Sequence, residues 1–264
     1  MFYVLGEIFM LAYVFSVLAA VGVVAIAALS FRLAGKGSDD HAADGPSAGH
    51  AGAMLSALFL LVFAIAIIVP WTTADAARQN THAESRAAID AYWAAADLPA
   101  DAVAPVRTGL RDYVTFVVKD EWPVMGHGEM HAAGSARLDE LRARVVELDG
   151  GTEDQQEARG AVLDRIGAIS AARAQRASDA AATPPEGLLL LTILTGLVVV
   201  VFPFLAGARP RGAALLPLAA MAAMLGFGIY LTWDISYAFA GPLAVGPEAF
   251  SGALQEFARI AGGV

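Results

Sequence analysis

The sequence predicts an all-α integral membrane protein with four transmembrane helices and an all-helical extramembrane insert between the second and the third. Its 264 residues are 57% hydrophobic and only 16% charged, and the mean hydropathy of +0.58 exceeds that of soluble domains of this size. The charges are concentrated in residues 72–184, which hold 12 Lys and Arg and 18 Asp and Glu, whereas the rest of the chain holds 5 and 8. Apolar residues within that charged part recur at helical spacing.

Four nearly uncharged segments are each long enough to cross about 30 Å of hydrocarbon as a helix, which takes about 20 residues. They are Tyr3–Leu33, Ala51–Trp71, Gly187–Ala208 and Gly212–Trp233. The first has no basic n-region and is about twice as long as a typical signal h-region, so we expect an uncleaved span. These segments divide the chain into residues 1–71, with two spans and a flexible loop at 35–52; the insert, 72–184; the last two spans, 185–239; and a C-terminal tail with a short helix, 240–264.

The insert shows helical stripes of apolar residues and no period-two alternation of useful length. The stripes are Val106, Leu110, Tyr113 and Val117; Leu138, Leu141, Val145 and Leu148; and Val162, Ile166 and Ile169. A helix over about 74–96 continues directly from the second span and ends before Pro99. Thr152 and Gln155 have the spacing of a capping box, and Ser135 is expected to cap the helix that begins near it.

The distribution of basic residues predicts the orientation in the membrane. The two short loops carry Arg32, Lys36, Arg209 and Arg211, whereas the N-terminal tail has no Lys or Arg. Because basic residues in short loops favour the cytoplasmic side and long loops cross largely regardless of charge, we expect the insert to be extracytoplasmic.

Several classes of function are disfavoured by what the sequence lacks. The chain has no Cys, which excludes disulfides, iron–sulfur clusters, thiolate zinc sites and cysteine nucleophiles. It has no Gly-x-Ser-x-Gly, phosphate-binding glycine loop or His-Glu-x-x-His motif, so we predict that it is not an enzyme. A net charge of −9 disfavours nucleic acid as a partner. The expected partners are the lipid bilayer and either copies of the same chain or other proteins of a membrane complex.

Two groups of residues in the spans are candidate functional sites. Asp234 lies at the end of the fourth span, and an intramembrane acid is a functional hypothesis by default, although a carboxylate near the interface can also simply reach water. Phe59, Phe63 and Ile67 share one face of the second span and are candidates for an apolar pore constriction. The alternative for this face is a plain core or lipid-facing stripe.

A short loop in the insert is the one candidate for a metal. The string Met125-Gly-His-Gly-Glu-Met-His131 brings two imidazoles, a carboxylate and two thioethers within seven residues. Through His127 and His131 it predicts a weak copper or zinc site. The alternative is a solvated connector between two helices, and no other cofactor is expected.

Two longer strings resemble a known family. They are Tyr113-Val-Thr-Phe-Val-Val-Lys-Asp-Glu-Trp-Pro-Val-Met125 and Phe239-Ala-Gly-Pro-Leu-Ala-Val-Gly-Pro-Glu-Ala-Phe250, and they resemble the bacterial bestrophin-like family of four-span membrane proteins. The residues that mark the likeness are Glu121, Trp122, Pro123, Gly241 and Pro242.

The resemblance implies a multi-pass protein of the bacterial inner membrane. It also implies an oligomer related to anion channels, in which the second span lines the pore. The alternative is a non-conducting membrane protein whose extracytoplasmic helical domain binds a partner, a metal or a larger membrane complex.

Overall fold

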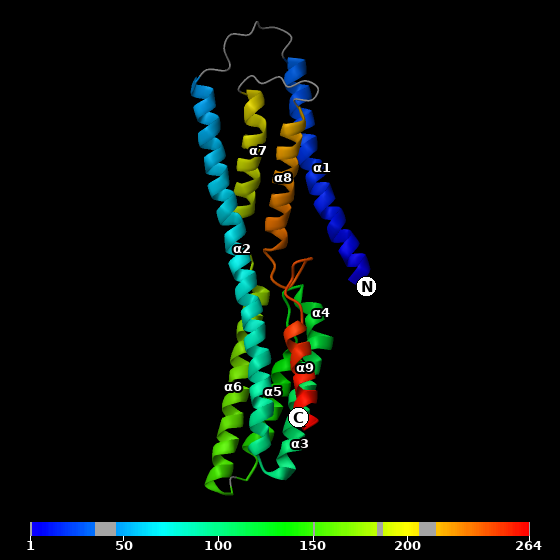
Figure 1. The fold of residues 1–264 in the computed structure, drawn as a ribbon, viewed down its shortest axis with the longest axis vertical. Coiled ribbons are helices and arrows are strands. Elements are labelled where there is room, and N and C mark those ends of the chain that lie inside the picture. The colour runs from blue at the N-terminus through cyan, green and yellow to red at the C-terminus, as the bar shows by residue number, and fades with distance from the viewer. Residues whose placement is uncertain (1, 35–45, 150, 184–186, 206–214, 264) are drawn as a thin grey trace. The chain divides into compact units, whose positions relative to one another are not determined.

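The computed structural model describes residues 2–34, 46–149, 151–183, 187–205 and 215–263, and all regular structure within these ranges is helical (Figure 1). This confirms the predicted all-α class for the described residues. The chain divides into two compact units. The membrane unit comprises Met1–Trp71 and Pro184–Ser236, and the extramembrane domain comprises Thr72–Thr183 and Tyr237–Val264.

The membrane unit contains three helices that are long and apolar enough to cross a bilayer, counted over the described residues. They are α2 (Pro46–Ala94), α7 (Leu188–Leu205) and α8 (Leu215–Asp234). The N-terminal helix α1 spans Phe2–Ala34, and its apolar stretch Val14–Ala27 is shorter. Of the predicted loop at 35–52, residues 35–45 lie outside the described residues, and the remainder is helical because α2 begins at Pro46.

Small residues bring the helices of the membrane unit close together. A Cβ atom at Gly226 of α8 would lie only 2.7 Å from the backbone oxygen of Ser16 in α1, and the Ser16 hydroxyl donates a hydrogen bond of 3.2 Å to the Gly226 carbonyl. Glycines at such positions let helix backbones approach in lipid. The α1–α8 contact therefore depends on Gly226.

The extramembrane domain is a bundle of helices built around one large apolar core. Besides the C-terminal part of α2, it contains η1 (Ala95–Asp97), α3 (Ala100–Phe116), the π-helical segment η2 (Val117–Glu121), α4 (Trp122–Met125), α5 (Ala132–Val146), α6 (Glu153–Ala181) and α9 (Glu248–Ala261). The C-terminal tail belongs to this unit because α9 buries Phe250 and Phe257 in its core. The Phe257 ring stacks on Tyr92 of α2 at 4.3 Å between centroids.

The predicted stripes form this core, and all of their residues are buried except the partly buried Leu148. The capping box at Thr152 and Gln155 is confirmed, with both reciprocal hydrogen bonds formed. The prediction that Ser135 caps a helix is wrong. Helix α5 begins one turn earlier, with His131 as its N-cap, so the Ser135 hydroxyl is free to accept a hydrogen bond of 3.2 Å from Arg173 Nε.

Candidate functional site

Four charged side chains meet inside the extramembrane domain, and together with the Tyr113 hydroxyl we call them the buried ion network. They are Glu84 of α2, Glu121 at the end of η2, and Arg173 and Arg176, one turn apart on α6. Glu84, Glu121 and Arg176 are 0% exposed, and Arg173 is 5% exposed. Two positive and two negative charges balance one another, which is the condition for burying charge at acceptable cost.

Arg176 connects the two glutamates. Its Nε donates to Glu84 Oε2 at 2.7 Å, and its Nη2 donates to Glu84 Oε1 and to Glu121 Oε1, both at 2.9 Å. The Tyr113 hydroxyl donates a short hydrogen bond to Glu84 as well. One guanidinium thereby joins α2, α6 and the end of η2.

Arg173 makes the second link through a two-pronged contact with Glu121. Its Nη1 lies 2.7 Å from Glu121 Oε1, and its Nη2 lies 2.5 Å from Oε2. The same Nη2 donates to the His131 carbonyl at 2.8 Å. Paired parallel hydrogen bonds of this kind fix orientation as well as charge, so Arg173 also positions the start of α5.

The π-helical turn explains how Glu121 reaches the network. Tyr113, Val117, Glu121 and Met125 are each four residues apart and all are buried. An α-helix has 3.6 residues per turn, so residues four apart drift by about 40° at each step and would leave the buried face. The π-turn closes its hydrogen bonds over one more residue and compensates for this drift.

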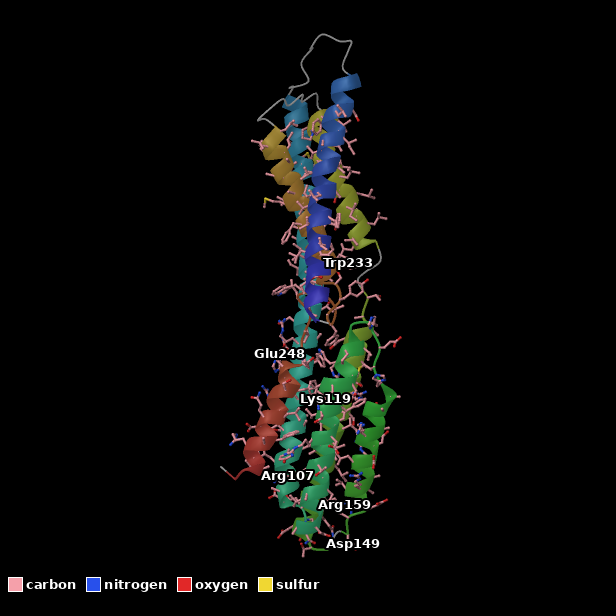
Figure 2. The ribbon with its side chains drawn as sticks, turned by 90° about the vertical axis from the view of Figure 1, so that its right-hand side faces the viewer. Arg107, Lys119, Asp149, Arg159, Trp233 and Glu248 are labelled. Carbon is pink, nitrogen blue, oxygen red and sulfur yellow. The ribbon has the colours of Figure 1, made fainter. Side chains whose placement is uncertain are left out.

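Aromatic rings cover the network. Trp122 makes edge contacts with Phe239 and Phe250 at 5.7 and 5.8 Å between centroids. The Arg176 guanidinium lies 5.6 Å from the Trp122 ring centre and 5.3 Å from that of Phe250, distances typical of cation–π contacts. The two strings singled out in the sequence therefore meet here. Figure 2 shows the side chains of this domain, with Lys119 marking η2 and Glu248 the start of α9.

The loop that carries Phe239 needs glycine at one position. Gly241 has φ = +93°, a backbone conformation that L side chains rarely adopt. The loop is closed by a hydrogen bond of 2.8 Å from the Val245 amide to the Ala238 carbonyl, and Pro242 follows the glycine directly. On the other string, Pro123 lies in α4, which follows η2 without a break. Because proline has no N–H, it cannot bond a carbonyl of the π-helical turn before it.

The model of the bestrophin-like domain matches residues 13–250. The chain belongs to the bestrophin-like family. No curated protein and no solved structure matches it. The match covers most of the membrane unit and most of the extramembrane domain, so it includes the residues of the ion network as well as the three apolar helices.

The residues predicted for a pore or an intramembrane site lie within the packed membrane unit of this bestrophin-like protein. Phe59 is buried and Phe63 and Ile67 are half-buried. The Phe63 ring occupies the hollow at Gly228 of α8, where a Cβ would lie 2.4 Å from it. This packing accounts for the two rings within one subunit, and a role in a pore stays a prediction. Asp234 is buried as the last residue of α8.

The histidine loop is split between two environments. His127 is exposed in the turn after α4, whereas the His131 ring packs near Phe116 at 6.1 Å. The Met125 sulfur lies 2.9 Å from Arg176 Nη1, so this thioether faces the buried ion network. Within the described ranges no group of three or more His, Asp or Glu side chains is placed to hold a metal. The metal site at His127 and His131 stays a prediction.

A groove of about 390 Å³ lies between α5 and α6 beside the network. Its lining includes His131, Ser135, Ser170 and Arg173. The nitrogen atoms Nε, Nη1 and Nη2 of Arg173 all donate to protein acceptors. The Arg173 guanidinium therefore lines this groove, and its charge is already compensated by Glu121.

Sequence reasoning missed Glu84, Arg173 and Arg176, although one signal was present. The apolar stripe Val162, Ile166 and Ile169 continues at the same spacing of four and three residues to Arg173 and Arg176. Charged residues in register with a buried stripe indicate buried, paired charges, because an unpaired charge there is very costly. The identity of their partners requires the fold.

The pKa values of Glu121 and Tyr113 are shifted in opposite directions. Burial alone would raise the pKa of Glu121, but hydrogen bonds from Arg173 and the charges of Arg176 and Arg173 outweigh it, so this pKa is below its ordinary value. The pKa of Tyr113 is well above its ordinary value, first because of burial and then because of the negative charge of Glu84. The two shifts favour a charged Glu121 beside the two arginines and a neutral phenol at Tyr113.

These shifts predict how stability depends on pH. The contribution of Glu121 is present above its unfolded pKa of about 4.3 and is lost as the pH falls through its lower folded pKa. The contribution of Tyr113 is complete below its unfolded pKa of about 10 and is lost as the pH rises toward its folded pKa. We expect Tyr113→Phe to reduce the loss of stability above pH of about 10, measured by urea unfolding across a pH series. An unchanged alkaline slope in this variant would contradict the assignment.

Gly134 lies against Arg173 of the network, so we expect Gly134→Ala to lower stability, whereas Gly→Ala in a helix usually raises it. A Cβ at Gly134 would lie 2.3 Å from Arg173 Nη2, whereas nothing lies within 4 Å of one at Gly160 of α6. Gly160→Ala is expected to stabilise the domain by up to about 1 kcal/mol through helix propensity. Gly134→Ala is expected to destabilise it by about 1–3 kcal/mol through overpacking. Urea unfolding of both variants tests this, and equal stabilisation would show that Arg173 does not occupy this space.

Proposed function

We propose that this bestrophin-like protein is a homo-oligomeric membrane protein that conducts ions, with anions as the preferred class and α2 lining the path. The observation that carries the proposal is the family match over residues 13–250, which includes spans and extramembrane domain together. Three apolar helices long enough to cross a bilayer support the membrane part. Large apolar side chains on α2, such as Leu58, Leu61 and Ile68, are more than half exposed and suit contact with lipid or with neighbouring subunits.

The proposal is tested by purifying the protein, measuring its mass in detergent and reconstituting it into liposomes. We expect a mass of several copies of the chain and a chloride efflux well above that of protein-free liposomes, with a smaller potassium efflux. An oligomer of the expected mass that gives no efflux above the protein-free level would contradict conduction. A monomer would contradict the assembly.

We further propose that α1 is a fourth span and that the extramembrane domain lies outside the cytoplasm of a bacterial cell. The support is the excess of Lys and Arg in the two short loops and their absence from the N-terminal tail, as the positive-inside rule describes. The chain has no cysteine, so single cysteines give a clean readout. We expect a cysteine at Asp139 to react with an impermeant thiol reagent in intact cells and one at Lys36 to be protected. The reverse pattern would invert the orientation.

A further inference from the structure

We propose that the buried ion network holds the extramembrane half of α2 through Glu84 and thereby sets the conformation of the α2 span, which regulates the conduction proposed above. The inference rests on that proposed function. Helix α2 is common to both units, with its residues up to Trp71 in the membrane unit and those from Thr72 in the extramembrane domain. The two halves belong to one continuous helix, so a constraint on the extramembrane half can act on the half in the membrane unit.

Three neighbouring positions on α2 make polar contacts with different parts of the domain. Glu84 is bound by Arg176 of α6 and by Tyr113 of α3. One turn earlier, the Asn80 amide donates to Asp179 of α6 at 2.8 Å. The Ser85 hydroxyl donates to the Ala249 carbonyl of α9 at 2.7 Å. Contacts with three helices fix both the rotation and the axial position of this part of α2.

Glu84 is the charged residue among these three, and because it is buried we expect its contacts to hold α2 most strongly. Both of its carboxylate oxygens accept hydrogen bonds from Arg176, and it is fully buried. Neutralising Glu84 leaves Arg176 with Glu121 alone and removes the balance of charge in the network. We expect the hold on α2 to loosen while the apolar core stays intact.

The same helix offers a matched control. Asp90 of α2 also pairs with α6, through Arg165 at 3.6 Å, but the two side chains are 44% and 53% exposed. Exposed pairs of this kind contribute little. Asp90→Asn therefore removes a carboxylate from the same helix without disturbing a buried contact.

Pro70 provides a place where the span can respond. It lies inside α2, next to Trp71, which is the last residue of this helix in the membrane unit. Proline has no N–H to donate within the helix and disfavours a straight helix at that point. A change in how α2 is held beyond Pro70 is expected to alter the helix geometry at this proline.

The test uses an Ala64→Cys substitution to carry a spin label at an exposed position of the α2 span, in the otherwise cysteine-free, full-length protein in liposomes. Glu84→Gln is expected to shift the label's mobility spectrum and to lower the chloride efflux about fivefold or more, the lower range of allosteric couplings. Asp90→Asn is expected to leave both as in the parent. Tyr113→Phe, which removes one hydrogen bond to Glu84, is expected to shift both in the same direction by less, and it keeps the test open if Glu84→Gln does not fold.

The two readouts separate this inference from the proposed function. A folded Glu84→Gln or Tyr113→Phe protein whose spectrum and efflux match the parent would overturn the inference and leave conduction standing. No efflux from the protein without these substitutions would contradict conduction. In that case, a spectral shift in Glu84→Gln and Tyr113→Phe but not in Asp90→Asn would still support the hold of Glu84 on the span.

Discussion

Arg176→Ala is expected to destabilise the extramembrane domain by about 3–5 kcal/mol, the usual cost of removing one partner from a buried ion pair. The substitution leaves Glu84 and Glu121 buried with Arg173 as the remaining cation of the network, and it also removes the contacts of the guanidinium with the Trp122 and Phe250 rings. Replacing all four charges by apolar residues of similar volume is a different experiment, whose cost is often small. The measurement is urea unfolding of the full-length protein in mild detergent, followed by circular dichroism.

Arg144→Ala is the matched control for Arg176→Ala. Arg144 pairs with Glu140 one turn away on α5, and the two side chains are 49% and 64% exposed. The expected loss is below about 1 kcal/mol, as for other exposed pairs. If the two alanine variants unfold at the same urea concentration, Arg176 does not hold the domain together.

Trp122 is partly buried against the core, so Trp122→Ala is expected to cost about 3 kcal/mol, the lower end of the range for large aromatic residues in cores. Its ring contacts Phe239, Phe250 and the Arg176 guanidinium. Removing it takes away the ring contacts that Trp122 makes with Phe239 of the loop after α8 and with Phe250 of α9. The same unfolding measurement applies.

Trp93 provides the comparison for Trp122. It is also a tryptophan of the extramembrane domain, but it is 48% exposed, and its ring contact is with the exposed Arg259 at 6.0 Å. Trp93→Ala is expected to cost much less than Trp122→Ala. Similar losses for both would mean that the contact between the two strings does not stabilise the domain.

Sequence patterns predicted the architecture because it depends on local rules. Helix length against bilayer thickness predicted four spans, of which three are found as long apolar helices among the described residues. Spacings of three and four predicted the core positions, such as Leu110, Leu141 and Ile166. The capping box at Thr152 is also a purely local signal. The start of α5 was misjudged because Ser135, a residue type that favours N-caps, serves Arg173 instead.

The network could not be predicted because its partners are far apart in the chain. Glu84, Glu121 and Arg176 are brought together by three helices, and no local spacing links them. Glu121 and Trp122 were singled out by the family resemblance alone, and the structure supplies the physical reason for these residue types. For Phe59 and Phe63, periodicity predicted that the two rings share one face of a helix. It could not predict which residues that face contacts, such as Gly228 beside Phe63, because this depends on the fold.

The central claim is that Glu84 of α2 and Arg176 of α6 act as one buried unit, and a double-mutant cycle tests it most directly. Urea unfolding of Glu84→Gln, Arg176→Met and the double variant gives the coupling energy of the pair. We expect the double variant to be less destabilised than the sum of the two single variants, by about 1.5–3 kcal/mol, the upper part of the range for residues in contact. Losses that add to within about 0.5 kcal/mol, as for distant sites, would contradict it.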